Sequence, residues 1–242
     1  MVSIDSVTDG IYRLGTKWVG WYLIAGDAVT VVDCGFPGYH DQLPRALAEL
    51  GRPLDSVTAI VLTHYHSDHV GSAERIRAET GATVYVPAGD AEEVRSGKVP
   101  APGGLASSLW RPRVICYMAH AARFGGGSVD PVARFRTYED GEVLAGASGL
   151  RPVHTPGHTR GHCSLLAERP GVLFAGDALA TFSFLRGRTG PQLLSFNEDA
   201  DEARESLSRL EPLSAGTVVV GHGRPFEGPP AEAVSAARAA SA

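Results

Sequence analysis

The sequence predicts an α/β fold made of two related halves, and three observations support this prediction. Short runs rich in β-branched and aromatic residues are separated by glycine, which is typical of strands. Several of these runs are followed by segments in which apolar residues recur at helical spacing. The order of strands, helix, strand and polar loop returns in broad outline in the second half. With 242 residues and no low-complexity linker, we expect one domain spanning residues 1–242.

The first half contains the clearest strand and helix signals. The run Val57–Leu62 is almost entirely apolar, which predicts a strand covered on both faces. A helix fits residues 39–50, because Leu43 and Leu47 share one face and Gly51 follows as a stop signal. We expect further strands at Ile11–Leu14, Trp21–Ile24, Val29–Val32 and Thr83–Val86, and a short helix at Ala88–Arg95.

Residues 96–131 interrupt this pattern. Proline and glycine recur throughout the segment, and helical turns are expected only at 105–109 and 114–124. An irregular stretch of this length inside a compact domain is typical of a functional or mobile segment. We therefore expect a lid at about residues 96–131.

The second half repeats the strand-rich style. We expect a helix over about residues 198–210, capped at its start by Asn197, and a terminal helix over residues 231–240. The predicted strands are Arg151–Thr155, Cys163–Ala167, Val172–Ala175 and Thr217–Val220.

Composition limits the classes of partner and the cellular locations that we expect for this protein. The formal net charge of -5 gives no reason to expect a nucleic acid or an acidic membrane surface as partner. No run approaches ~20 consecutive apolar residues, and the first residues lack the pattern of a secretory signal. The three cysteines are too widely spaced for a disulfide framework. We expect a cytoplasmic protein that acts on a small molecule, as a monomer or a homodimer.

The six-residue run His64–His69, HYHSDH, is the strongest chemical signal in the chain. It places three imidazoles and one carboxylate directly after an apolar strand. These side chains bind zinc and similar divalent ions, and burying them without a partner is costly. The run therefore predicts a metal site.

Three further strands end in a candidate ligand. His158 follows Arg151–Thr155, Asp177 follows Val172–Ala175, and His222 follows Thr217–Val220, each preceded by a glycine that lets the backbone turn sharply. Together the four strand ends supply seven ligands, a number that suits two metal ions in one cleft. The seven are His64, His66, Asp68, His69, His158, Asp177 and His222.

Five segments together resemble the motifs of the metallo-β-lactamase superfamily, in the same order along the chain. They are VVDCG at 31–35, THYHSDHVG at 63–71, HTPGHTRGH at 154–162, AGD at 175–177 and GHG at 221–223. The resemblance spans almost the whole chain and implies an αββα sandwich of two similar halves. The third segment is similar to the glyoxalase II branch, and the ligand set is similar to that of lactonase-like branches.

The resemblance also implies a role for each ligand. The first metal would be held by His64, His66 and His158, the second by Asp68, His69 and His222, with Asp177 bridging the two. Asp33 would support the metal loop through hydrogen bonds, which is consistent with the need of an imidazole ligand for an oriented partner on its other nitrogen.

The function implied by the resemblance is that of a metal-dependent hydrolase with two zinc ions, and iron or manganese would suit the same ligands. Two ions about 3.5–4 Å apart can activate a shared water. The resulting hydroxide would attack the carbonyl of a small ester, thioester or lactone. Asp68 would orient this nucleophile and carry a proton to the leaving group.

Alternative functions remain open. A mononuclear iron sulfur dioxygenase uses a subset of the same ligands, and a non-catalytic metal-binding module needs no reaction at all. Dedicated β-lactamases of the superfamily generally lack the bridging aspartate, so Asp177 is consistent only with weak β-lactamase activity. Diiron flavoproteins are disfavoured, because they place a glutamate where this chain has His66.

Aromatic residues outside the motifs are candidates for a substrate pocket. They lie beside the first predicted hairpin and in the two irregular segments, where an apolar wall would favour a substrate with an aromatic or acyl body. The candidates are Trp18, Trp21, Trp110, Tyr117, Phe182 and Phe184.

Overall fold

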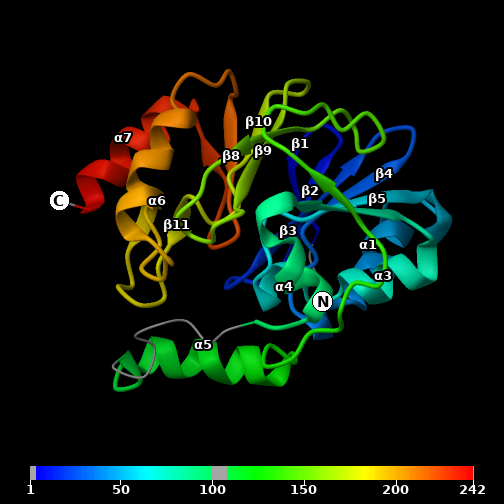
Figure 1. Ribbon diagram of the computed structural model, residues 1–242, viewed down its shortest axis with the longest axis horizontal. Helices are drawn as coiled ribbons and strands as arrows, with labels where there is room; N and C mark the ends of the chain where they lie inside the picture. Colours follow the sequence, from blue (N-terminus) through cyan, green and yellow to red (C-terminus); the bar gives the residue numbers. More distant parts are fainter. Residues whose placement is uncertain (1–3, 100–107, 242) are drawn as a thin grey trace.

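A computed structural model describes residues 4–99 and 108–241 and arranges them in four layers. Two sheets lie at the centre, and helices cover the outer side of each (Figure 1). Three apolar clusters fill the spaces between these layers. The arrangement confirms the predicted α/β sandwich of two halves.

The first sheet has seven strands in the order β1-β2-β3-β4-β5-β6-β7. Strands β1 to β4 pair antiparallel, whereas β4 to β7 run parallel because helices connect them. The strands are β1 (Asp5–Thr8), β2 (Ile11–Gly15), β3 (Gly20–Ala25), β4 (Val29–Val32), β5 (Val57–Val61), β6 (Thr83–Pro87) and β7 (Arg136–Tyr138). The helices of this half are α1 (Gln42–Glu49), α2 (Ser67–Val70), α3 (Ala73–Thr80) and α4 (Ala91–Ser96).

The second sheet has five strands in the order β14-β13-β10-β9-β8. Its strands are β8 (Arg151–His154), β9 (Cys163–Ala167), β10 (Val172–Phe174), β13 (Thr217–Val219) and β14 (Phe226–Glu227). A separate pair is formed by β11 (Ala180–Phe182) and β12 (Thr189–Gln192). Helices α6 (Ala200–Ser206) and α7 (Pro230–Ser241) cover the outer side of this half (Figure 1).

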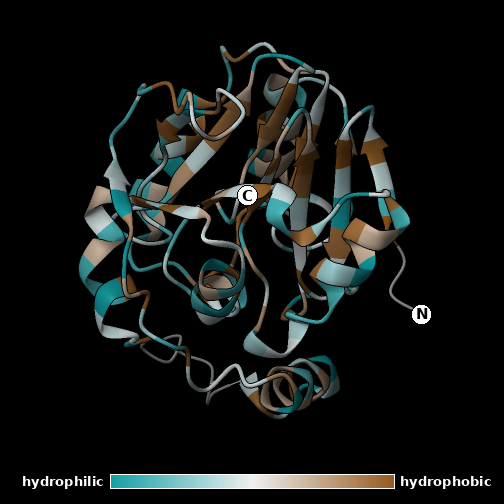
Figure 2. Ribbon diagram, turned by 90° about the vertical axis from the view of Figure 1, so that its right-hand side faces the viewer, coloured by the Kyte–Doolittle hydropathy of each residue, from teal (hydrophilic) through white to brown (hydrophobic). Residues whose placement is uncertain are grey.

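Apolar packing between the two sheets holds the halves together. Tyr22 of β3 meets Phe174 of β10 edge-on, with ring centroids 5.5 Å apart. Hydrophobic residues are concentrated on the strands, and the outer helices carry more hydrophilic residues (Figure 2). Burial of both faces explains why β5 reads as an unbroken apolar run.

The segment predicted to be irregular contains a regular helix, α5 (Pro112–Arg123). This helix stands apart from the layers beneath the two sheets (Figure 1). The backbone N–H of Gly38 donates to the carbonyl of Phe124, which attaches the end of the helix to the first half. Residues 100–107 of the predicted lid lie outside the described residues, and the mobility of the lid stays a prediction.

Two details of the sequence prediction are wrong. Helix α6 is capped by Asp199, whose side chain accepts from the N–H groups of Asp201 and Glu202, so Asn197 is not the cap. Strands β1, β7, β11, β12 and β14 were not predicted, because they are short and partly exposed and carry little apolar pattern.

A hydroxyl group joins the two halves next to the site. Tyr22 donates to the carbonyl of Val220 (2.7 Å) and accepts from its N–H (3.2 Å). Tyr22→Phe would leave both buried Val220 groups without this partner, so we expect a loss of about 2 kcal/mol in the free energy of unfolding. Urea denaturation measures the change, and a loss below about 0.5 kcal/mol would show that the hydroxyl adds nothing.

No helix among residues 4–99 and 108–241 is long and apolar enough to cross a membrane. The cytoplasmic location and the oligomeric state stay predictions.

Candidate metal centre

The seven predicted ligands lie in the segments that follow strands β5, β8, β10 and β13, and two of them, Asp68 and His69, are in the short helix α2. Strands β10 and β13 are parallel neighbours, so their following residues Asp177 and His222 leave the sheet at the same edge. The backbone at Gly221, directly before His222, passes close to the ligands, because a side chain at this position would collide with Asp177 and His69. Glycine at this position therefore gives the ligands the space they occupy.

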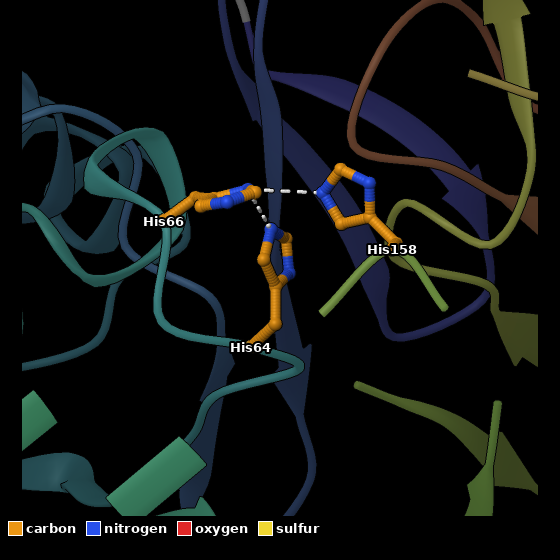
Figure 3. A group of neighbouring side chains, drawn as sticks. All are labelled: His64, His66 and His158. Carbon is orange, nitrogen blue, oxygen red and sulfur yellow. Dashed lines mark hydrogen bonds between the residues drawn. The ribbon is translucent and has the colours of Figure 1, made fainter. Parts of the chain in front are cut away.

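Three imidazoles from the two halves meet at one point. His66 Nδ1 lies 3.1 Å from His64 Nε2 and 2.9 Å from His158 Nε2 (Figure 3). His64 and His66 come from the loop after β5, and His158 comes from the loop after β8. Nitrogen ligands around a tetrahedral zinc ion lie about 3.3 Å apart, because each Zn–N bond is about 2.0–2.1 Å. The cluster thus has the spacing of a metal site.

Asp177 connects this cluster to a second one. Its Oδ2 lies 3.3 Å from His158 Nε2 and 3.2 Å from His222 Nε2, and its Oδ1 lies 3.4 Å from His69 Nε2. Asp68 adds a second carboxylate, with Oδ2 3.4 Å from His222 Nε2. The ligand atoms of Asp68, His69 and His222 lie within 4.8 Å of one another. Asp177 is therefore placed to touch both groups.

The first three imidazoles are neutral in this environment. Burial, followed by the neighbouring His69, holds the pKa of His64 well below its ordinary value. Burial and then His158 lower the pKa of His66 to about 3. Burial also lowers the pKa of His158. Neutral imidazoles present lone pairs rather than protons, which is the state that binds a metal.

The second group has the opposite electrostatics. Burial lowers the pKa of His222, but the carboxylate of Asp177 outweighs it and raises the value to about 9. Burial raises the pKa of Asp177, but His222 and His69 outweigh it and hold it well below its usual range. Without a metal, protonated imidazoles thus balance the carboxylates. A divalent cation can replace those protons.

Two buried atoms at the centre lack any hydrogen-bond partner among the described residues. They are Nε2 of His69 and Oδ1 of Asp177, which face each other. An unpaired buried polar atom costs about 1–3 kcal/mol. A metal ion would satisfy both atoms, so the residues present fit divalent metals.

The outer nitrogen of three ligand imidazoles is held by a fixed partner. His69 Nδ1 donates to Asp33 Oδ2 (2.8 Å), and His222 Nδ1 donates to the carbonyl of Trp18 (2.7 Å). His158 Nδ1 lies 3.2 Å from Oδ1 of Asn197, its acceptor. These bonds leave Nε2 free on the metal side. Asp33 therefore occupies the position predicted for it, whereas the role of Asn197 was missed.

A sequence profile of the metallo-beta-lactamase superfamily matches residues 19–222. The chain belongs to this superfamily. A probable metallo-hydrolase of Bacillus subtilis (strain 168), YflN, is 31% identical over 208 residues, covering 82% of this chain and 76% of that protein. A hydroxyacylglutathione hydrolase of Rhodospirillum rubrum is 31% identical over 196 residues, covering 81% of this chain and 57% of that protein.

Solved structures agree with this assignment. A metallo-beta-lactamase family protein of Thermus thermophilus has a TM-score of 0.68 and 27% identity, covering 95% of this chain and 78% of that chain. A metallo-beta-lactamase mutant from Cronobacter sakazakii has a TM-score of 0.71 and 20% identity, covering 100% and 96% of the two chains, and shows likeness of fold alone.

One buried carboxyl group, that of Asp90, links the loop after β5 to the loop after β8. Asp90 accepts from the N–H of Tyr65 (3.2 Å), the hydroxyl of Thr159 (2.7 Å) and the N–H of Gly161 (2.7 Å). Tyr65 lies between His64 and His66, and Thr159 follows His158. Asp90 therefore fixes the loops that carry three of the ligands, although no sequence signal marked it.

Asp90 also makes stability depend on pH. Burial raises its pKa from 3.8 to about 6, although three donors favour the ionised form. Between these two values the folded state binds more protons than the unfolded state, so stability falls as pH rises. The shift corresponds to about 3 kcal/mol, present below about pH 3.8 and lost above about pH 6. Urea unfolding of the metal-free protein measures the free energy of unfolding across this pH range. It should fall with pH in the wild-type protein but not through this group in Asp90→Asn. Equal pH dependence in the two proteins would contradict a raised pKa of Asp90.

A cavity of about 280 Å³ opens beside the ligands. Its floor contains His66, Asp68, His158, Asp177 and His222. Its walls are mostly apolar and are formed by Phe36, Ser67, Val99, Tyr117, Met118, Ala121, Gly126, Gly127, Phe184, Leu194 and Phe196. The metal groups therefore have direct access to an apolar space.

Only two of the six predicted pocket residues, Tyr117 and Phe184, line this cavity. Trp18 and Phe182 pack against each other behind it, with ring centroids 5.9 Å apart. The remaining two do not line it either, so four of the six pocket predictions are wrong. Trp21 is fully buried in the core of the first half, and Trp110 is 74% exposed. An aromatic side chain alone does not indicate which face of its element is free.

The remaining histidines differ in their relation to the site. His162 is buried beside it, where its Nε2 accepts from the N–H of Asp177 (2.9 Å) and its Nδ1 donates to Thr155. His154 instead contacts the carbonyl of Arg160, away from the ligands. His40 is buried against Glu79, with a contact of 2.8 Å.

Proposed function

We propose that the protein is a hydrolase with two zinc ions that attacks the carbonyl carbon of a small ester, thioester or lactone. The observation that carries the proposal is the convergence of seven imidazole and carboxylate ligands, five of which line the floor of one apolar cavity. The hydroxyacylglutathione hydrolase relative supports thioesters as one substrate class.

The ligand groups suit the division expected from the sequence. His64, His66 and His158 would hold one ion, and Asp68, His69 and His222 the other, with Asp177 between them. When bound, two such ions lower the pKa of water and polarise a carbonyl oxygen. Asp33, Asn197 and the carbonyl of Trp18 keep the imidazole rings in the tautomer that this binding requires.

Asp68 is the residue placed to move a proton. It lines the cavity floor, and its Oδ2 accepts a hydrogen bond from the hydroxyl of Tyr117 (2.9 Å). We assign Oδ2 to take the proton of the attacking water and to deliver it to the leaving group. The bond from Tyr117 would fix the orientation of that carboxylate, so helix α5 contributes directly to the site.

The apolar walls would position the substrate and limit the access of water. No serine or cysteine nucleophile is needed, and the chain has no G-x-S-x-G motif that would supply one. A bound substrate would place its carbonyl group toward the ligand floor and its apolar part against Tyr117, Phe184 and Met118, which line the cavity.

A substrate panel tests the proposal. Zinc-reconstituted protein is assayed against thioesters, esters, lactones and β-lactams, with a chelator-treated sample as control. The proposal predicts metal-dependent turnover of at least one carbonyl compound of the first three classes. Oxygen consumption with a persulfide substrate and one iron per chain would favour the sulfur dioxygenase, and turnover of β-lactams alone would favour a β-lactamase.

A further inference from the structure

We propose that the cavity selects substrates whose acyl group is uncharged and apolar along its whole length, and that it excludes acyl groups ending in a carboxylate. This inference rests on the proposed hydrolase function and narrows its substrate class. It follows from the composition of the cavity walls, from their aromatic packing and from the positions of the nearest cations.

The described walls contain no lysine or arginine. Ser67 is the only polar wall residue besides Tyr117 among the described lining residues, and both lie at the ligand end. A carboxylate at the far end of a bound acyl group would thus find no cationic partner among the described lining residues, and burying an unpaired carboxylate costs several kcal/mol.

The basic residues near the cavity walls do not line the described cavity. Lys98, Arg123 and Arg186, the nearest in sequence to the wall residues Val99, Ala121 and Phe184, are exposed. Arg111 donates to the carbonyl of Leu185 (2.7 Å) and stacks on Trp110. Lys17 lies over the ring of Trp18, with its Nζ 4.8 Å from the ring centroid.

Aromatic stacking gives one wall a flat apolar surface. The rings of Tyr117 and Phe184 are stacked with centroids 4.0 Å apart and an angle of 9° between their planes. Phe196 continues the row at 5.8 Å from Phe184. Met118 and Phe36 contribute to the rest of the lining. A flexible alkyl chain can lie along such a surface and bury its methylene groups, each worth about 0.8 kcal/mol.

Chain length and terminal charge can be tested with one series of esters. The substrates are p-nitrophenyl esters of acetic, butyric, hexanoic and octanoic acid, and the mono ester of suberic acid, which matches octanoate in length but ends in a carboxylate. We expect kcat/KM to rise up to about fourfold per added methylene until the cavity is filled. The suberic ester should react at least about a hundredfold more slowly than the octanoic ester.

Matched lysine variants locate the effect in the cavity wall. Met118→Lys places a cation in the lining, and Ile115→Lys places the same charge on the same helix at a position that is 52% exposed. Met118→Lys should raise the ratio of suberic to octanoic ester turnover at least about tenfold, whereas Ile115→Lys should leave it within about twofold. If Met118→Lys does not fold, Leu194→Lys takes its place in the test, because Leu194 also lines the cavity.

A binding measurement separates this inference from the proposed hydrolysis. Calorimetry on zinc-loaded and metal-free protein compares methyl heptyl ketone with the analogue whose terminal methyl is replaced by a carboxylate. Tight binding of the ketone alone without turnover of any ester would reject the hydrolase but support the cavity inference. Equal binding of both probes, or equal turnover of the octanoic and suberic esters, would overturn the inference whatever the outcome for hydrolysis.

Discussion

His66→Ala and Asp68→Ala are each expected to lower kcat/KM of the zinc-loaded protein by about a thousandfold. His66 Nδ1 contacts both His64 Nε2 and His158 Nε2, so its removal leaves the three-imidazole group one ligand short. Asp68 is both a proposed ligand and the proposed proton carrier. Loss of metal-based stabilisation removes several kcal/mol from the transition state, which corresponds to this factor.

Two variants away from the ligands are matched controls for this experiment. His154→Ala removes a histidine that contacts only a loop carbonyl, and Asp41→Ala removes an exposed carboxylate on the first half. Both controls should retain turnover within about twofold. Near-native turnover in His66→Ala or Asp68→Ala, with two zinc ions still bound, would show that the proposed mechanism is wrong.

Asp33→Ala is expected to weaken metal binding about tenfold to a hundredfold and to destabilise the fold by about 3 kcal/mol. The Asp33 carboxylate accepts from the N–H of Thr63 (2.8 Å), from the Thr63 hydroxyl (2.9 Å) and from His69 Nδ1 (2.8 Å). All three donors are buried, so alanine would leave them without this acceptor. Zinc competition with a chelator measures the first effect and urea unfolding the second.

The backbone at Asp33 requires its own control, because its φ of 58° lies in the left-handed region. An asparagine at this position would tolerate the conformation and keep the side-chain volume, so Asp33→Asn isolates the loss of the carboxylate. We expect Asp33→Asn to weaken zinc binding nearly as much as Asp33→Ala while losing less stability. Zinc affinity unchanged in both variants would exclude the role of Asp33 in orienting His69.

The ligands could be predicted from the sequence because each follows a strand. The apolar run before His64 and the glycines before Asp177 and His222 mark where the chain leaves the sheet. Parallel neighbouring strands bring their following loops to one edge, so local patterns were enough to group residues far apart in the chain. The alternation of strands and helices predicted an α/β fold of two related halves, and the four-layer sandwich was implied by the resemblance to the superfamily.

The residues that support the ligands could not be predicted, because their roles depend on contacts across the fold. Asn197 is 39 residues from His158, the ligand that it orients. Asp90 joins two loops through bonds that span 25 and 71 residues. The cavity walls combine helix α5 with the segment around Phe184, and the sequence shows neither that pairing nor the direction in which Trp21 points.

We propose that this chain carries two zinc ions and that both are needed for hydrolysis. Native mass spectrometry during stepwise zinc addition to the metal-free protein, with turnover of an activated ester measured on the same samples, tests it most directly. We predict two zinc ions per chain and turnover that follows occupancy of the second ion. Full activity at one metal per chain, or a protein that retains a single iron and consumes oxygen, would contradict the claim.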